Sequence, residues 1–307
     1  MPRKSSDTRP SIFISHSSAN VAVAQEVEAA LHGAGFEVWL DHSDIRVGVL
    51  LGKELQNAIA SSRVVVLLWS EAAKASSWVT TELLTAFHLD RFIVPCALDR
   101  TEFPQFLSRA VHIDLATDRA GALAKLPTDI TRAPNKHNGF PGVRIYQAPE
   151  LEAIIRDLNT CQMAVLDAVG KDQLAEAATL QQQLDPLMVT AETTWPYDPT
   201  ILNLAAYHRK NSYMITHWAE YCASRFPTDP LLDHARARFF ETLLINPLEY
   251  SALNGLGNIF LFQGELDAAH FFVSTAIRCA ENDGVEYWQA KNDRTIIEAR
   301  LIDAGQA

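Results

Sequence analysis

Cysteine is scarce and dispersed in this chain. Four cysteines occur among 307 residues, and no two form a C-x-x-C pair: Cys96, Cys161, Cys222 and Cys279. This spacing argues against a zinc site and against a disulfide framework, so we expect reduced, buried thiols and no metal site. No apolar run approaches the roughly 20 residues of a membrane span. The basic N-terminus lacks the apolar segment of a secretory signal, and we therefore expect a cytoplasmic protein without a membrane partner.

Positively charged residues are fewer than negatively charged ones. The chain has 26 Lys and Arg and 37 Asp and Glu, so its net charge is −11. Binding to a nucleic-acid backbone requires clustered Lys and Arg, and none are clustered here, so nucleic acid is not an expected partner. The sequence patterns of P-loops, dinucleotide-binding loops, zinc proteases and nucleophile elbows are absent. With 48% hydrophobic and 21% charged residues, the chain reads as globular protein, and its length allows roughly two domains.

Strand and helix patterns alternate through the first 130 residues. Strands are predicted at 11–14, 36–40, 64–68, 92–97 and 110–115, and helices at 20–32, 50–61 and after Ser76 or Ser77. The alternation predicts an α/β fold, a flavodoxin-like parallel five-stranded sheet with helices on both faces. Ligands of such sheets bind beyond the carboxyl ends of the strands. We therefore expect Ser15, Asp41, Ser70 and the helix that carries Glu82 to converge at one edge.

Glu82 occupies an unusual position in its predicted helix. Val79, Leu83 and Ala86 form the apolar face at helical spacing, and Glu82 falls on the flank of that face. An unpaired charge beside a core is costly. The residues alone therefore leave two alternatives: a paired structural glutamate, or a carboxylate placed to meet a ligand.

An ordered set of segments resembles a TIR (Toll/interleukin-1 receptor) domain of bacterial type over residues 8–130. The segments are SIFISHSSAN, GAGFEVWLD, DIRVG, AIASS, VVVLLWS and S-x-W-V-x-x-E-L. The resemblance implies that Glu82 is the catalytic residue of an enzyme that cleaves NAD at the nicotinamide–ribose bond, with NAD as substrate and no cofactor. It also implies that the loop 41–50 is the family's BB loop, through which subunits associate. Leu51 stands where many bacterial members have Trp.

Six further side chains are candidate substrate-binding residues on this resemblance: Phe13, Ser15, His16, Asp41, Arg46 and Trp78. Each also has an ordinary structural explanation. Ser15 and His16 can cap the first helix, bind phosphate at its N-terminus, or do both. The two aromatic side chains can belong to the core, and the aspartate and arginine can be loop residues in solvent.

Residues 131–149 are rich in Pro, Gly and Asn and are either a linker or a strap across the first domain. Domain boundaries are thus predicted at 1–130, 131–149 and 150–307. Helices are predicted at 149–169, 171–186, 198–225, 229–245, 248–263 and 265–281. Residues 250–281 resemble a tetratricopeptide repeat, in which Gly257 and Ala269 allow close helix approach and Gly264 turns the chain.

Three functions are compatible with this pattern. The first is an NAD glycohydrolase, active as an oligomer and controlled by the helical domain, as in bacterial immune effectors and virulence factors that this family includes. The second is a TIR scaffold that signals by self-association, and the third is a nucleotide sensor. Residues 131–307 hold 14 Lys and Arg against 22 Asp and Glu. Because helical repeats present a concave surface, a protein or peptide trigger is expected there.

Overall fold

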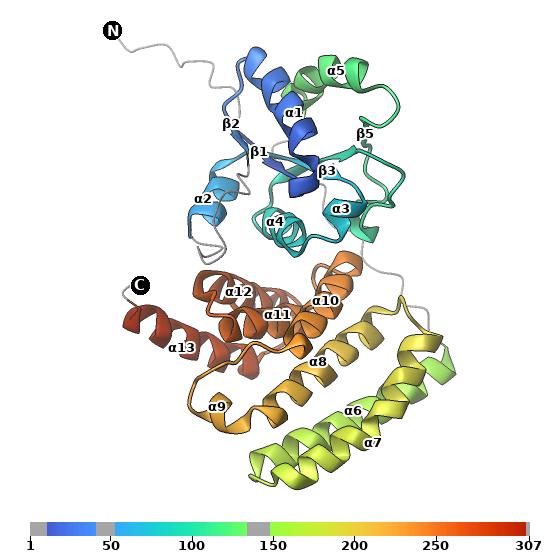
Figure 1. The fold of residues 1–307 in the computed structure, drawn as a ribbon, viewed down its shortest axis with the longest axis vertical. Helices are drawn as coiled ribbons and strands as arrows, with labels where there is room; N and C mark the ends of the chain where they lie inside the picture. The colour runs from blue at the N-terminus through green and yellow to red at the C-terminus, as the bar shows by residue number, and fades with distance from the viewer. Residues whose placement is uncertain (1–10, 41–52, 134–147, 305–307) are drawn as a thin grey trace. The chain divides into compact units, whose positions relative to one another are not determined.

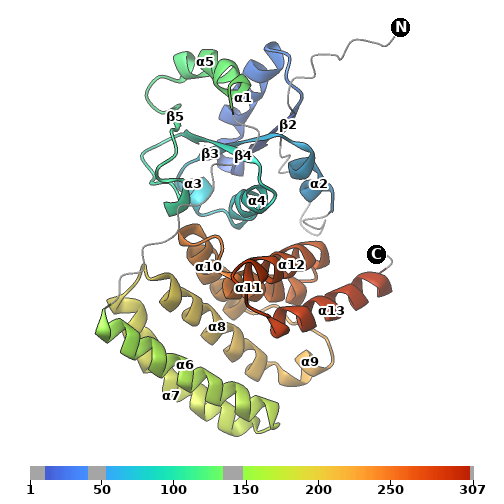
Figure 2. The same ribbon diagram turned by 180° about the vertical axis from the view of Figure 1, so that it is seen from behind.

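The computed structural model describes residues 11–40, 53–133 and 148–304. The chain divides into two compact units, Met1–Pro141 and Gly142–Ala307. Figures 1 and 2 show the sheet and its helices in the first unit and, among the described residues of the second, helices alone. Within the described ranges, every helix is too short or too polar to cross a bilayer.

The first unit is built on a sheet of five parallel strands: β1 (Ile12–Ser15), β2 (Val38–Leu40), β3 (Val64–Trp69), β4 (Phe92–Ala97) and β5 (Ile113–Asp114). Their order is β2-β1-β3-β4-β5, which confirms the predicted flavodoxin-like α/β fold. All six residues of β3 are buried, as the apolar, mostly β-branched run predicted. The predicted strand 110–115 is limited to the two residues of β5.

Helices cover both faces of this sheet: α1 (Val21–Gly33), α2 (Lys53–Ser61), α3 (Glu71–Lys74), α4 (Ser77–His88) and α5 (Arg119–Thr131). Short 3-10 helices lie at Ser18–Asn20 and Gln105–Leu107. Figures 1 and 2 place α1 and α5 on one face and α2 and α4 on the other. Ile12 and Ile14 pack into the α1 and α5 core. Since side chains alternate along a strand, Phe13 and Ser15 point to the α4 face.

The second unit consists of helices: α6 (Pro149–Gly170), α7 (Leu174–Thr194), α8 (Pro199–Thr216), α9 (Trp218–Cys222), α10 (Pro230–Ile245), α11 (Tyr250–Phe262), α12 (Leu266–Asn282) and α13 (Trp288–Asp303). Three antiparallel pairs follow one another, namely α6 with α7, α8 with α10, and α11 with α12. The predicted helix 198–225 is thus two helices, and α13 lies outside every predicted segment.

The predicted end of a helix at residue 186 is wrong, because α7 continues through Pro186 to Thr194. Proline removes one backbone hydrogen bond from a helix interior. On either side of this proline, however, Leu184, Met188 and Ala191 lie on one face and are buried in the same core cluster. Their burial on both sides of the proline outweighs the local cost.

Glycines set the closest approach in the hairpin of α11 and α12. A Cβ atom on Gly257 would lie 2.5 Å from Val273 Cγ2 and 3.2 Å from the carbonyl oxygen of Ala269. Gly264 turns the chain between the two helices with a φ of +80°, which favours glycine. A Cβ atom on Gly255 would lie 2.2 Å from Phe239 Cζ, so α10 also packs closely against α11.

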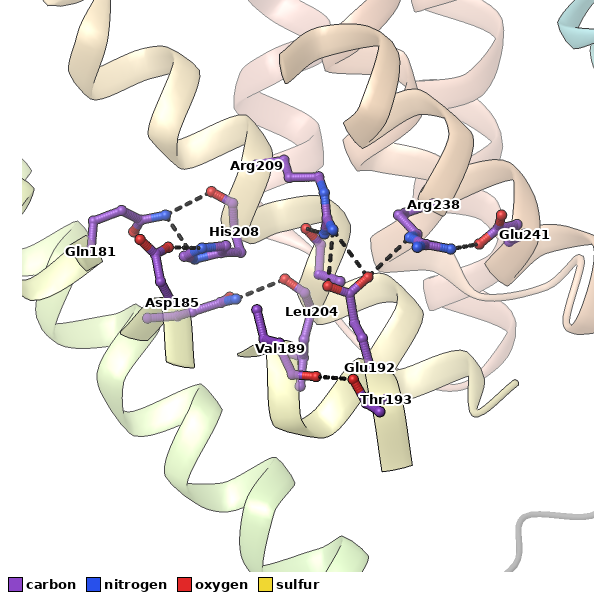
Figure 3. A network of polar contacts seen from close by, with 12 residues as sticks. Gln181, Asp185, Val189, Glu192, Thr193, Leu204, His208, Arg209, Arg238 and Glu241 are labelled. Carbon is purple, nitrogen blue, oxygen red and sulfur yellow. Dashed lines mark hydrogen bonds and ion pairs between the residues drawn. The ribbon is translucent and has the colours of Figure 1, made fainter. Parts of the chain in front are cut away.

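Polar contacts join α7 to α8 and α10 (Figure 3). Gln181 Nε2 lies 2.8 Å from His208 Nδ1, and Asp185 Oδ1 lies 2.7 Å from His208 Nε2. Two turns after Asp185 in α7, Glu192 accepts two hydrogen bonds from Arg209, and Arg238 Nε lies 3.0 Å from Glu192 Oε1.

The expectation of buried thiols is correct for two of the four cysteines. All four are free, but Cys161 and Cys222 are exposed, because they lie on outward positions of α6 and α9. Burial raises the pKa of Cys96 to about 12 and that of Cys279 to about 11. These two thiols are therefore protonated and unreactive near neutral pH.

Candidate functional site

Glu82 lies in the middle of α4, a helix with a well-defined start. The hydroxyl of Ser76 accepts a hydrogen bond from the backbone N–H of Val79 at 3.3 Å, so Ser76 is the capping residue. Glu82 was predicted on the flank of an apolar face, and its exposed fraction is 0%. The prediction underestimates its burial because α4 also packs against α2 and β1, which are distant in sequence, and against the neighbouring α3. The carboxylate is thus removed from solvent.

Ser15 contacts this carboxylate. It ends β1, is fully buried, and its Oγ donates a hydrogen bond of 2.6 Å to Glu82 Oε2. Removing a carboxylate from water is costly unless donors replace its hydration, and a hydroxyl donor to a charged acceptor is a strong replacement. The carboxyl end of β1 and the middle of α4 therefore meet at one buried polar contact.

A second polar cluster links the carboxyl ends of β1 and β3. Asn20 Oδ1 accepts hydrogen bonds from Ser17 Oγ at 2.5 Å and from Ser70 Oγ at 2.7 Å. Ser70 also accepts from the backbone N–H of Ala73 and so caps α3. Ser17 makes no such side-chain cap to the first helix, in contrast to the capping alternative for this segment. Asn20 was not singled out from the sequence, although its spacing of three from Ser17 is a recognisable signal.

The structure brings four of the six candidate substrate-binding residues near Glu82 in the fold. Phe13 and His16 are buried in and immediately after β1, on either side of Ser15. Trp78 is half-buried in the first turn of α4, four residues before Glu82 and so on the same side of the helix. Asp41 and Arg46 lie outside the described residues, as do the loop 41–50 and Leu51.

The chemistry available at this edge is that of a carboxylate with a hydroxyl donor. In the parts of the chain that the structure describes, no group of three or more His, Cys, Asp and Glu side chains is arranged to hold a metal ion. A single buried carboxylate can stabilise positive charge that develops on a bound substrate. It can equally stabilise the fold by joining a strand to a helix.

Comparison with protein families matches residues 12–126 to the TIR domain. The matched segment begins at the first residue of β1 and ends within α5, so it includes the whole sheet and both Ser15 and Glu82. The first unit therefore contains a TIR domain. In a search among curated proteins, none matched this chain.

Proposed function

We propose that the TIR domain of this chain cleaves NAD at the nicotinamide–ribose bond, with Glu82 as the catalytic carboxylate. The observation that supports this function is the buried Glu82 carboxylate, held by the Ser15 hydroxyl at the carboxyl end of β1. TIR domains include NAD-cleaving members, and ligands of doubly wound sheets bind at this edge.

The reaction suits a site with one carboxylate. Departure of nicotinamide, which is cationic within NAD, needs no general acid and leaves an oxocarbenium-like ribose. The Glu82 anion stabilises that cation more than it stabilises the ground state, and this difference is what accelerates the reaction. Water then attacks the anomeric carbon and loses a proton, which gives ADP-ribose; attack by an internal nucleophile of the substrate would give a cyclic product instead.

Ser15 acts in this proposal as a positioning residue. Its hydrogen bond fixes Oε2, one of the two carboxylate oxygens of Glu82. We assign substrate binding to Phe13 and His16, which lie near Ser15 in the chain, and to Trp78, which lies one turn before Glu82 on α4. Asp41 and Arg46 remain proposed substrate contacts from the loop 41–50.

A non-catalytic scaffold is the second candidate function, and the complete burial of Glu82 favours it. A carboxylate with an exposed fraction of 0% that hydrogen-bonds a strand residue is a common structural feature. TIR domains commonly self-associate, so this unit would then act by assembly alone, and the helical unit would receive the trigger.

Two measurements on the same sample separate these functions. The full-length protein is incubated with NAD, free nicotinamide is quantified by chromatography, and light scattering records assembly. Release of nicotinamide in equal amount to the NAD lost supports the enzyme. Protein that assembles while all of the NAD stays intact contradicts the enzyme and supports the scaffold.

A further inference from the structure

The outward face of α13 carries a stripe of uncharged side chains. Residues that are alternately four and three apart share one face of a helix, because successive residues are about 100° apart around its axis. This spacing joins five exposed residues: Trp288, Asn292, Thr295, Ala299 and Ile302. The buried residues Ala290 and Ile297 lie on the opposite face, and α13 packs mainly against α12 at the end of the stack (Figure 2). The stripe therefore faces away from the helices of its own unit.

The alternation of four and three is the heptad spacing of a coiled-coil seam. Val285 continues it before the helix and is 39% exposed, while Trp288 and Ile302 are each 65% exposed. The last helix of a helical stack ordinarily has a polar outer face, which keeps the stack soluble. Exposed apolar side chains that share one stripe, unlike scattered ones, mark a surface that another molecule covers.

Two opposite charges flank the stripe on one side. Lys291 and Glu298 are seven residues apart, and each comes immediately before a stripe residue, so they occupy equivalent heptad positions. The ammonium of Lys291 lies 5.4 Å from the centre of the Trp288 ring and is therefore next to the stripe.

Both charged side chains also have ion pairs within the chain. Lys291 Nζ lies 3.2 Å from Glu286 Oε1, and Glu298 Oε1 lies 3.5 Å from Arg294 Nε. Further contacts are a 4.0 Å pair of the lysine with Glu281 and a 3.4 Å pair of the glutamate with His270. Exposed pairs of this kind contribute little to stability, so both side chains can also bond to a neighbouring molecule.

We propose that α13 pairs antiparallel with α13 of a second copy of this chain about a twofold axis, with the stripe as the seam. Trp288 of each copy then packs on Ala299 of the other, so that a large side chain fills the space beside a small one. Val285 meets Ile302 at each end of the seam. This inference does not depend on NAD cleavage.

A polar pair lies at the centre of this seam. Asn292 of each copy lies opposite Thr295 of the other. The hydroxyl of Thr295 donates to the Lys291 carbonyl at 3.1 Å and so can accept a hydrogen bond from the Asn292 amide. Polar residues at single seam positions fix the register of a coiled coil.

Charge selects the same direction and register. Lys291 of each copy lies opposite Glu298 of the other, which gives two symmetric ion pairs. A parallel pairing would instead place Trp288 on its own copy and Glu298 beside Asp303, another carboxylate. Sliding the antiparallel pair by one heptad would place two Glu298 side chains, or two Lys291 side chains, opposite each other. Like charges across an interface are unfavourable, so a single arrangement is favoured.

A twofold contact closes after two copies, so α13 gives a dimer and not a filament. This contact is separate from association through the loop 41–50, which the TIR resemblance implies. The seam is short and lies at the low end of specific interfaces, so we expect a dissociation constant on the order of 10 µM.

Sedimentation velocity of the full-length protein over a concentration series tests the pairing. Wild type should pass from monomer to dimer at concentrations on the order of 10 µM. Lys291→Glu and Glu298→Lys each place like charges across the seam and should weaken association about tenfold. An equimolar mixture of the two variants recreates both ion pairs and should regain the dimer. Because mixing changes neither fold, this gain can come only from contact between copies.

The matched control is Lys171→Glu, which reverses an exposed lysine at the end of α6 and disrupts its ion pair with Asp167. It should associate as wild type does. Association through the TIR domains is common to all of these proteins, so the differences among them report on α13. A monomeric wild type, equal association of wild type and the two seam variants, or a mixture that stays dissociated would overturn the proposal.

Discussion

The hydrogen bond from Ser15 Oγ to Glu82 Oε2 joins the sheet to the proposed catalytic residue. Ser15→Ala removes it and leaves the buried carboxylate with one donor fewer, which should cost about 1–3 kcal/mol of unfolding free energy. Because the carboxylate also loses its fixed orientation, kcat for NAD should fall about tenfold with little change in KM. Denaturation and steady-state kinetics measure the two effects. The matched control is Ser11→Ala at the other end of the strand, where Oγ donates to the Ser61 carbonyl. Equal kcat values in the two variants would show that Ser15 does not position the catalytic group.

At the same scale, the sequence predicted Glu82 and the helix that carries it, but not the complete burial of its side chain. The spacing in S-x-W-V-x-x-E placed Glu82 on the correct helix, and the strand pattern placed Ser15 at the correct sheet edge. The complete burial of Glu82 could not be read from one helix, because β1, α2 and α3 produce it together. The role of Asn20 depends on Ser70, fifty residues away, and no local pattern reveals such a contact.

At the scale of elements, the contact between α7 and α8 should depend on pH. Burial is the main influence on His208 and lowers its pKa below the ordinary 6.5, and the charge of Arg209 lowers it further. The hydrogen bond and charge of Asp185, and the charge of Glu192, act in the opposite direction. The unfolded chain therefore binds a proton at His208 more readily than the folded chain. Stability from this group is complete above about pH 6.5 and is lost as the pH falls below it. Denaturation of wild type and His208→Gln between neutral and acidic pH measures the difference. A constant difference between them at all pH values would contradict this coupling.

The packing of α11 against α10 allows a second test at this scale. Gly255→Ala would place a methyl group 2.2 Å from Phe239 Cζ, and the phenyl ring is fully buried. Overpacking of this kind should destabilise the helical unit by about 1–3 kcal/mol. Gly170→Ala is the control, since its added Cβ atom would meet nothing within 4 Å. Far-ultraviolet circular dichroism during denaturation measures the stability of both variants. Unfolding of the two variants at the same denaturant concentration would contradict the close packing described here.

Element boundaries show where local patterns fail. The five strands and the hairpin of α11 and α12 follow from apolar patterns and glycine positions. The continuation of α7 past Pro186 depends on burial of Met188 and Ala191 against other helices. Helix α13 was not predicted because most of its residues are polar. With two buried positions, it has no apolar face that a sequence pattern could reveal.

At the scale of the whole molecule, we propose that the active form is an oligomer. The loop 41–50, which lies outside the described residues, is the proposed contact between TIR domains, and a head-to-tail contact of this kind forms rings or filaments. Turnover per molecule should then rise steeply with protein concentration. Light scattering beside the NAD assay checks this prediction. Full specific activity in a strictly monomeric preparation would contradict it and would leave the assignment of Glu82 intact.

The most direct measurement compares nicotinamide release by wild type, Glu82→Gln and Glu37→Gln at one protein concentration. Glu82→Gln preserves the size of a fully buried side chain, and Glu37 is exposed immediately before β2. With Glu82 as the catalytic carboxylate, Glu82→Gln should lose about 100-fold or more of the turnover, while Glu37→Gln should equal wild type. Circular dichroism confirms that all three are folded. Turnover by folded Glu82→Gln within a few-fold of wild type would contradict the catalytic role of Glu82.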